Sequence, residues 1–506
     1  NKNIFAEALG PDSTYTSEKI IRYIRGECLE TGANCGDSCC GDPNPLFRDR
    51  RVAADGDLKV WKLGDIMNSS PKILSGSPLQ DYHMDYADRS YYDFIADPKY
   101  RQRSAVAFAG ANDGMLHAFR AGHIQDTGLA GKIKAMFRDA GDSLGEEIWA
   151  FIPYNAFPYL KYLARPDYCH IYYSDLTVRL ADASIGGEPE ATRTKGSWRT
   201  VLIGGMRFGG AGGPGGSPST PPASSSEIGY SSYFALDVTD PERPLPLWEF
   251  SDPDLGYASG VPAIVRTGDR EKNGKWFAVF GSGSKTLPKG GVDIKRNKPG
   301  YIYFLDLETG ELVKKAKIGS GCIVGDILAV DENLDFVSEK IYFGTAHYGS
   351  SKWDGQLISM DAPHNIGLEG DAASYTVLFA GNYPFTASPE AAKDTKGSVW
   401  VYAGSGKYYS DLDEKDKSEQ IFIGMKDFGI VAEKRDLSDV TGIHTEGEKS
   451  GTEKICSYDP DYKAFRLKEV VTSINLLSGK VSEPRIGWVL SMKNGERVLS
   501  RPLVIG

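Results

Sequence analysis

The sequence predicts an all-β protein, specifically a modified β-propeller with irregular insertions and a few short helices. Short runs rich in Val, Ile, Tyr, Phe and Trp are bounded by Gly, Pro, Asp and Asn, which is typical of strands joined by tight turns. A strand–turn–strand pattern also recurs along the chain. Because a single hairpin cannot bury its apolar face alone, radial packing of several four-stranded units is the favoured solution. A pair of β-sandwiches is the alternative.

The local elements follow from the same patterns. Helical periodicity is confined to two short segments, 17–27 and 155–166. The clearest strands are predicted at 199–205, 275–283, 339–345 and 398–406.

The repeat sets the expected number of blades. Its copies lie at 114–122, 233–250, 301–318, 355–362, 421–429 and 487–502. From the second copy onward, the aligned turn residues Asp237, Asp306, Asp361, Asp427 and Asn494 are 69, 55, 66 and 67 residues apart. The first step, from Arg120 to Asp237, is 117 residues, which has room for two units or for one unit with a large insertion. We therefore expect six to eight blades and favour seven.

Composition excludes several classes of protein. The chain has 506 residues and a net charge of −10. A general nucleic-acid binder is disfavoured, because the phosphate backbone repels a negatively charged protein. No stretch approaches the ~18 consecutive apolar residues of a membrane span. Glycine is abundant, with 58 residues, and a block at 204–216 followed by a Ser- and Pro-rich run predicts a mobile surface loop. No Lys-Ser or Lys-Thr follows this block, so it is not a phosphate-binding loop.

Four of the seven cysteines, Cys28, Cys35, Cys39 and Cys40, crowd into the N-terminal region. Their spacing is poor for zinc, and no C-x-x-C-H motif indicates haem. A disulfide-stapled loop in an oxidising compartment fits best, while free thiols and a metal remain open. We divide the chain into a cysteine-rich lead-in, 1–54, and a propeller domain that fills the rest, 55–506. The missing signal sequence leads us to interpret the chain as a mature or excised fragment.

A run of oxygen-bearing residues predicts a metal site. Asp331, Asn333, Asp335 and Glu339 occupy positions 1, 3, 5 and 9 of a short loop, and Val337 stands at position 7, which normally offers its backbone carbonyl. Alternate residues of a tight loop can point inward together, as a hard cation such as Ca²⁺ requires. The spacing therefore indicates calcium, and a solvated acidic turn is the alternative.

Two features weaken the match. Position 6 of such loops is usually glycine in a left-handed turn, and here it is Phe336. The closing residue, Glu339, is longer than the usual aspartate. A second acidic segment, 408–420, is interrupted by lysines and is predicted to be a solvated hairpin loop.

Several phrases together resemble the C-terminal propeller of the PilY family, called PilC in some lineages, which are type IV pilus tip-associated and biogenesis proteins. The matching phrases are WKLGDIMNSSPKIL (61–74), VAFAGANDGMLHAFRAG (106–122), YCHIYYSDLTVRLADA (168–183), SYFALDVTDP with LWEFSDPDLGYASGVPAIV (232–265), and WVYAGSGKYYSDLD with IFIGMKD (400–427). They keep the family's order over nearly the whole chain.

The resemblance implies function as well as fold. The family's calcium loop follows the pattern D-x-[DN]-x-D-G-x-x-D, and Asp331, Asn333, Asp335 and Glu339 fall on its positions. The family resemblance implies a non-enzymatic, calcium-binding pilus biogenesis factor and tip adhesin that regulates pilus extension and retraction. The implied partners are minor pilins at the pilus tip and a host or abiotic surface ligand. The implied location is extracellular, at the cell surface or pilus tip, with outer-membrane association as a further option.

Other polar residues are interpreted as structural. Asp113 and His117 lie in an Asn-Asp-Gly turn and its return strand, where packing or hydrogen bonding is favoured over acid–base catalysis. We make the same prediction for His170, Asp175 and Asp182. No nucleophile elbow and no H-E-x-x-H helix is present.

The vicinal pair Cys39–Cys40 supports an alternative, since some calcium-using quinoprotein (PQQ) dehydrogenases are propellers with an adjacent-cysteine disulfide. Their tryptophan-docking repeats are only partly matched here, and the cysteines precede the first blade. We therefore favour a protein without enzymatic activity.

Overall fold

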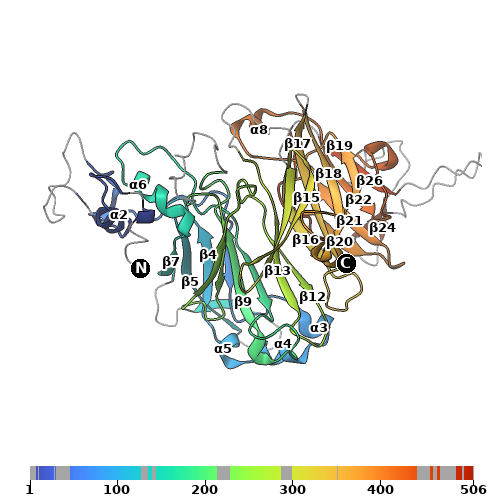
Figure 1. Ribbon diagram of the computed structural model, residues 1–506, viewed down its shortest axis with the longest axis horizontal. Coiled ribbons are helices and arrows are strands. Elements are labelled where there is room, and N and C mark those ends of the chain that lie inside the picture. The colour runs from blue at the N-terminus through green and yellow to red at the C-terminus, as the bar shows by residue number, and fades with distance from the viewer. Residues whose placement is uncertain are drawn as a thin grey trace, which may run out of the picture. The chain divides into compact units, whose positions relative to one another are not determined.

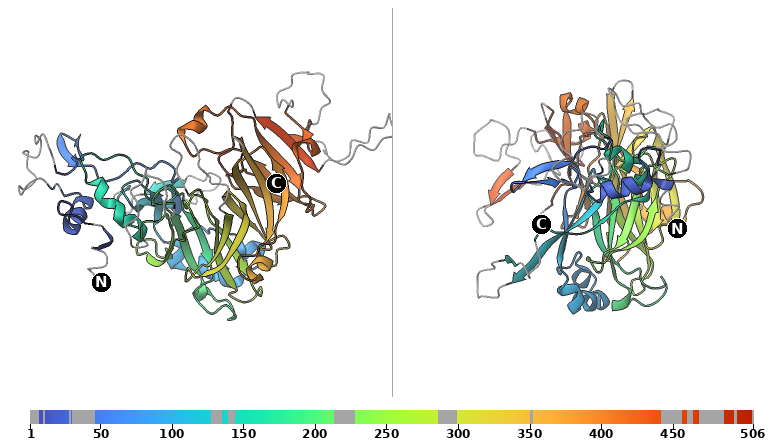
Figure 2. Two further views of the ribbon diagram at one scale, coloured as in Figure 1. Left: turned by 45° about the horizontal axis from the view of Figure 1, so that its top comes forward. Right: turned by 90° about the vertical axis from the view of Figure 1, so that its left-hand side faces the viewer.

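Strands dominate the computed structural model, whose ribbon is drawn in Figures 1 and 2. The structure describes residues 7–9, 11–27, 29, 46–126, 135–138, 144–212, 228–285, 299–349, 352–441, 456–459, 464–467, 486–492 and 495–504. The chain forms two compact units. The first comprises Asn1–Ala278, Ser282–Leu287 and Leu305–Leu312, and the second comprises Val279–Gly281, Pro288–Phe304 and Val313–Gly506.

The first unit contains two antiparallel sheets. One has the order β3-β4-β5-β6, with β7 also paired to β5, and consists of β3 (Lys72–Leu74), β4 (Ala105–Gly110), β5 (Leu116–Asp126), β6 (Ala135–Arg138) and β7 (Glu147–Phe151). The other has the order β11-β10-β9-β8 and consists of β8 (Arg179–Ala183), β9 (Arg199–Gly205), β10 (Tyr233–Asp237) and β11 (Leu245–Phe250). Residues of both sheets share one apolar core, which includes Phe108, Leu116, Leu202 and Phe234.

Short helices and a hairpin complete this unit. The helices are α2 (Ser17–Ile24), α3 (Tyr82–Asp85), α4 (Arg89–Ile95), α5 (Pro98–Arg101), the 3₁₀ turn η2 (Tyr154–Tyr159), α6 (Leu160–Leu163) and the 3₁₀ turn η3 (Lys195–Ser197). Thr16 caps α2 by accepting from the amide of Lys19, and α2 lies beside α6 (Figure 1) around a core that includes Ile20, Tyr159 and Leu163. Strands β1 (Arg51–Ala54) and β2 (Asp57–Val60) form a separate hairpin that spans the predicted boundary at residue 54.

A third sheet contributes strands to both units, with the order β12-β13-β14-β15. Its strands are β12 (Ala263–Thr267), β13 (Lys275–Gly281), β14 (Pro299–Asp306) and β15 (Leu312–Ser320). The second unit then holds the order β16-β17-β18-β19 and the order β20-β21-β22-β26-β23. These strands are β16 (Cys322–Val330), β17 (Lys340–Gly349), β18 (Lys352–Asp361), β19 (Thr376–Gly381), β20 (Glu390–Lys393), β21 (Val399–Gly404), β22 (Gln420–Lys426), β23 (Ser438–Asp439) and β26 (Gly487–Met492).

Two sheets of the second unit share one core. Tyr342 and Leu357 of the first sheet pack in the same apolar cluster as Val401, Ile421 and Met425 of the second. The remaining elements are α7 (Ala362–Gly367), α8 (Asp411–Lys415), the 3₁₀ turn η4 (Lys434–Asp436) and a two-stranded pair, β24 (Cys456–Asp459) with β25 (Ala464–Leu467).

The five sheets of four or five strands in the described part of the chain agree with the predicted β-propeller class. The repeat predicted six to eight blades, with seven favoured, but its copies at 421–429 and 487–502 are not separate blades. Strands β22 and β26 pair directly, with Ile423 opposite Val489, and so belong to the same sheet.

The described part of the glycine block is mostly buried, contrary to the prediction of a mobile surface loop over 204–216. Residues 204–212 are described, Gly204 and Gly205 end β9, and residues 213–216 lie outside the described part. A Cβ on Gly209 would lie 2.0 Å from the carbonyl oxygen of Tyr173, so close packing requires glycine there.

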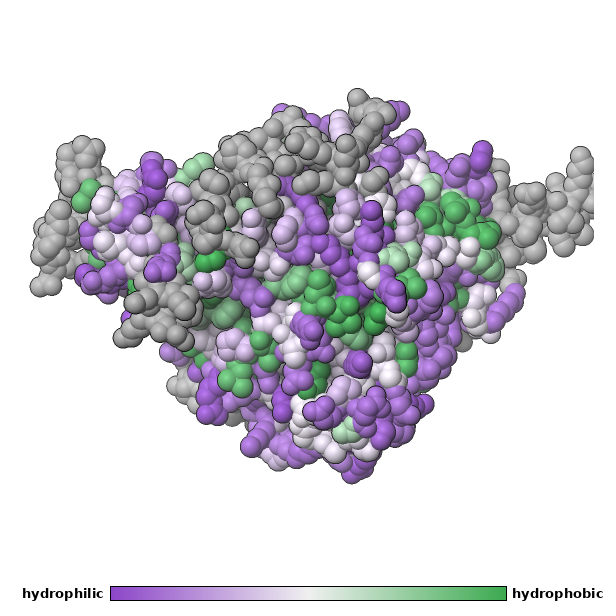
Figure 3. All heavy atoms as spheres, viewed as in Figure 1, coloured by the Kyte–Doolittle hydropathy of each residue, from purple (hydrophilic) through white to green (hydrophobic). Residues whose placement is uncertain are grey.

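The face shown in Figure 3 carries polar side chains over most of its area, with apolar side chains in separate groups. Many of the largest apolar side chains, including Trp198 and Tyr303, are fully buried instead. Among the described residues, no helix has the length and apolar character needed to cross a membrane.

Candidate metal centre

The loop predicted to bind metal joins two neighbouring strands of the second unit. It starts after β16 and ends before β17, and Val330 and Lys340 are paired across its base. The loop is thus the tip of an antiparallel hairpin, and the hairpin fixes the distance between its two ends.

The structure brings three of the predicted residues together. Asp331, Asp335 and Glu339 each offer a carboxylate oxygen, and these oxygens lie within 4.8 Å of one another. Asn333 lies beside them, since its Oδ1 accepts from the amide of Asp335 at 2.8 Å and its Nδ2 donates to Asp335 Oδ2 at 3.1 Å. Val337 donates its amide to Asp335 Oδ1 at 2.8 Å. All five predicted residues therefore belong to one local structure.

Two residues of this loop adopt a left-handed backbone. Leu334 has φ +60° and Phe336 has φ +72°. Asp331 holds this shape, because its two carboxylate oxygens accept from the amides of Leu334 at 2.6 Å and Phe336 at 2.8 Å. Position 336 keeps the conformation expected of glycine although it carries a bulky side chain. The ring is only 4% exposed, so its burial offsets the backbone strain.

Replacing Leu334 and Phe336 with glycine is expected to change the free energy of unfolding by different amounts. Leu334 is 55% exposed, so Leu334→Gly relieves strain at little packing cost and changes the free energy of unfolding by less than about 1 kcal/mol. Phe336→Gly relieves the same strain but removes a buried ring, at a net loss of about 3 kcal/mol. Urea unfolding of both variants measures this difference. Equal losses would show that the Phe336 ring does not stabilise the loop.

Glu339 is the member of the cluster with an unsatisfied oxygen. Its Oε2 accepts from the amide of Glu332 at 2.6 Å, whereas its Oε1 is buried and has no hydrogen-bond partner in the described part of the protein. Burial raises the pKa of Glu339, and the charges of Asp331 and Asp335 add to this effect. Three mutually repelling carboxylates and an unpaired buried acceptor match the oxygen donor set of a hard divalent cation.

Residues outside the predicted loop connect it to the neighbouring sheet. Glu332 Oε1 accepts from Tyr342 Oη at 3.2 Å and pairs with Lys340 Nζ at 3.2 Å. Asp427, which follows β22, accepts from both donors at 2.9 Å. Lys393 Nζ donates to the carbonyl oxygen of Glu332. Sequence reasoning assigned no site role to these residues, although a strand was predicted at 339–345, directly after the loop.

Comparison with known proteins establishes the family. The family model described as the PilY1 β-propeller domain matches residues 63–441, about three quarters of the chain. The chain belongs to the PilY1 β-propeller family.

Two relatives with similar sequences are described as type IV pilus biogenesis factors. A type IV pilus biogenesis factor PilY1 homolog of Xylella fastidiosa (strain Temecula1) is 28% identical over 467 residues, covering 84% of this chain and 26% of the relative. The type IV pilus biogenesis factor PilY1 of Pseudomonas aeruginosa (strain PAO1) is 29% identical over 400 residues, covering 73% of this chain and 29% of the relative. The chain therefore spans less than a third of the length of these two relatives.

A solved structure supports the fold. The crystal structure of the P. aeruginosa PilY1 C-terminal domain aligns with a TM-score of 0.54 at 22% identity, covering 86% of this chain and 81% of that chain. The family resemblance and the propeller fold predicted from the sequence are both confirmed.

Two histidines of this PilY1-family chain, His117 and His170, lie beside carboxylates. His117 is buried, with Nε2 3.0 Å from Asp113 Oδ2 and Nδ1 2.9 Å from Glu147 Oε1. His170 is 41% exposed, and its Nε2 lies 3.0 Å from Asp65. The prediction that His117 bonds within its sheet agrees with these contacts.

The two predicted structural aspartates are fully buried. Asp175 accepts from the amide and side chain of Asn68 at 3.0 and 2.6 Å. Asp182 accepts from the hydroxyls of Tyr91, Tyr100 and Thr200 at 2.8, 2.8 and 2.6 Å. Each carboxylate therefore joins distant segments of the first unit.

The second acidic segment joins the antiparallel strands β21 and β22, as predicted for a hairpin loop, and most of its described residues are at least partly exposed, but it departs from a fully solvated loop in two respects. It contains α8, and the carboxylate of Asp413 is buried against Lys407 Nζ. Burial lowers the pKa of Lys407 to about 8. Local charge density suggested solvent exposure, but Lys407 from outside the acidic run supplies the partner that permits burial.

The disulfide prediction for Cys28, Cys35, Cys39 and Cys40 lies outside the described residues. Among the cysteines that the structure describes, Cys169 is an exposed free thiol and Cys322 is a buried one.

Proposed function

We propose that this chain is the calcium-binding propeller of a type IV pilus biogenesis factor. Membership of the PilY1 family and the names of the relatives support the pilus role. The observation that carries the calcium role is the cluster of Asp331, Asp335 and Glu339, with the buried, unpaired Oε1 of Glu339.

The loop residues would provide two kinds of oxygen ligand to the ion. Asp331, Asp335 and Glu339 would provide charged oxygens, and Asn333 and Val337 would provide neutral carbonyl oxygens. The ion supplies positive charge that cancels the repulsion among the carboxylates. Asp331 also holds the left-handed turn through the amides of Leu334 and Phe336, so the loop is partly organised before the ion binds.

Hydrogen bonds and ion pairs between the loop and the next sheet connect the proposed ion site to a surface that could contact a partner. Glu332 supplies its amide to Glu339 and its carboxylate to Tyr342 and Lys340, which in turn contact Asp427. A change at Glu339 thus reaches the segment after β22 through direct hydrogen bonds. We infer that calcium adjusts contacts with minor pilins at an extracellular pilus tip, and with a host or abiotic surface ligand, during extension and retraction.

A complementation experiment tests this function. Deletion of the gene is expected to remove most surface pili and attachment. The full-length gene is expected to restore both, and a full-length Asp335→Ala gene is expected to restore assembly but alter twitching or attachment. Sheared pili, twitching zones and adherent cells are counted for each strain. A deletion strain that assembles pili and adheres normally would exclude the pilus role.

A further inference from the structure

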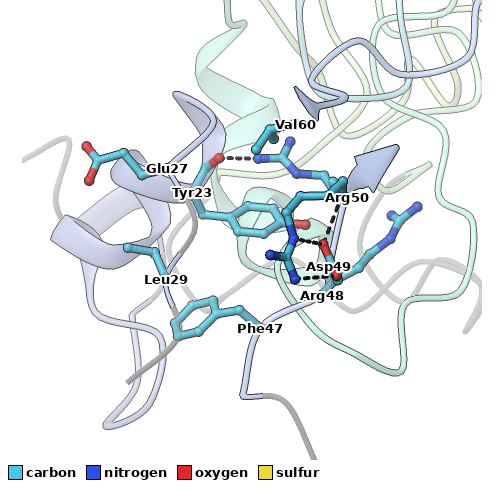
Figure 4. A pocket seen from close by; sticks show the side chains of 9 residues that line it. Tyr23, Glu27, Leu29, Phe47, Arg48, Asp49, Arg50 and Val60 are labelled. Atoms are coloured by element: carbon cyan, nitrogen blue, oxygen red, sulfur yellow. Dashed lines mark hydrogen bonds and ion pairs between the residues drawn. The ribbon is translucent and has the colours of Figure 1, made fainter. Parts of the chain in front are cut away.

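A recess near the N-terminus lies before the residues matched by the family model. It is formed by the end of α2, the segment 46–51 and β2, and spans about 310 Å³ of space, part of which is open solvent (Figure 4). Tyr23, Phe47 and Arg50 are among its lining residues. It belongs entirely to the first unit, whereas the candidate metal centre belongs to the second.

Arg50 is a cation at this recess that has no carboxylate partner among the described residues. Its guanidinium stacks on the Tyr23 ring, 3.8 Å from the centroid, and its Nη2 donates to the carbonyl oxygen of Tyr23. Its Nε is buried and has no hydrogen-bond partner in the part of the chain that the structure describes. Burial lowers the pKa of Arg50, which reflects the cost of holding this charge away from water.

The acidic groups that line the recess are already paired. Asp49 forms a salt bridge with Arg51 at 2.9 Å, and Glu27 forms one with Arg22 at 2.6 Å. No ion pair to Arg50 occurs among the described residues. The recess therefore carries positive charge that these two carboxylates do not neutralise.

Tyr23 adds a second unsatisfied donor. The side chain is only 2% exposed, and its hydroxyl has no hydrogen-bond partner among the described residues. Figure 4 shows the hydroxyl end of the ring directed toward the Asp49 side of the recess, with Arg50 on one side of the ring. A buried hydroxyl without a partner is unfavourable, so two independent groups at this recess each lack an acceptor.

We propose that this recess binds a small organic anion. Its carboxylate or phosphate head would accept hydrogen bonds from Arg50 and from the hydroxyl of Tyr23, which become stronger when the acceptor is charged. Leu29, Phe47 and Val60 line the same recess and provide apolar contacts for the carbon body. Charge, the two unpaired donors and apolar walls together specify this class of ligand.

Calorimetric titration with benzoate and phenyl phosphate tests the proposal, at constant ionic strength and with uncharged benzyl alcohol as a third probe. At least one anion is expected to bind saturably, and benzyl alcohol is not. Comparison of the two anions identifies the preferred head group. Arg50→Lys is expected to weaken binding roughly tenfold, because it loses a charged hydrogen bond and the stacked guanidinium.

Tyr23→Phe provides the decisive variant. The hydroxyl has no protein partner in the described structure, so its removal is expected to leave the melting temperature unchanged or raised while weakening anion binding. Arg25→Lys, on the exposed C-terminal end of α2, is the matched control and is expected to bind like the wild type. Absence of saturable binding by the wild type would overturn the proposal. Equal affinities for the wild type, Arg50→Lys and Tyr23→Phe would do so as well.

Discussion

Replacing Asp335 with alanine is expected to weaken calcium binding by at least roughly 10–100-fold. Removing a residue that only hydrogen-bonds to a metal ligand already costs this much affinity, and Asp335 is proposed as a ligand itself. Asp335 contributes a carboxylate oxygen to the cluster with Asp331 and Glu339, and its side chain is exposed. The substitution therefore removes a ligand and a negative charge with little effect on packing. Calorimetric titration of the chelator-treated, dialysed chain measures the affinity, and thermal melts with and without Ca²⁺ measure the linked stabilisation.

Glu332→Ala is the matched control for this experiment. It removes the same charge from the same loop, but the carboxylate of Glu332 faces Tyr342 and Lys340 instead of the cluster. Glu332→Ala is expected to retain most of the calcium affinity. A wild-type chain that shows neither heat nor a melting shift would refute the calcium site. Equal calcium affinities for the wild type and Asp335→Ala would show that Asp335 is not a ligand of the site.

Local sequence patterns predicted the elements whose contacts are local. The run 199–205, which contains Val, Leu and Ile in succession, became β9 over the same residues, because a short apolar run next to turn-forming residues defines a strand without reference to distant parts of the chain. The metal loop is a similar case. The alternating positions of Asp331 and Asp335 place their carboxylates together through a single tight turn.

Features that depend on distant partners were not predictable in the same way. The repeat at 487–502 seemed to be a separate blade, yet β26 pairs with β22 across a long insertion in the sequence. Phe336 seemed to disfavour a left-handed turn, but the turn persists because the Phe336 amide donates to Asp331 and the ring is buried in the folded chain. In each case tertiary contact outweighed local preference.

His117→Ala is expected to destabilise the chain by about 3 kcal/mol near pH 6. The imidazole is buried between Asp113 and Glu147, and Asp113 is itself only 4% exposed. Asp113 would keep its bonds from the amides of Gly64 at 2.7 Å and Met115 at 3.1 Å but would lose its only ion-pair partner among the described residues. Urea unfolding of both proteins measures the difference.

The effect of this substitution should depend on pH in a defined direction. Burial lowers the pKa of His117, but hydrogen bonds and attraction from Asp113 and Glu147 outweigh it and raise the pKa above the usual 6.5. The folded chain therefore holds the imidazole proton more tightly than the unfolded chain. This stabilisation is fully present below the unfolded-state pKa and is lost as the pH rises through the folded-state pKa. The difference in stability between wild type and His117→Ala should shrink from about pH 6 to about pH 9.

His170→Ala provides the comparison with an exposed histidine–aspartate pair. His170 also contacts an aspartate, Asp65, at 3.0 Å, but its side chain is 41% exposed, and exposed ion pairs contribute about 0–1 kcal/mol. We expect a loss in that range for His170→Ala at both pH values. If His117→Ala cost no more than His170→Ala, or if its cost stayed constant between the two pH values, the charged imidazole would not be what stabilises the turn before β5. Desolvation makes the contrast large, because Asp113 has no access to water that could replace the lost partner.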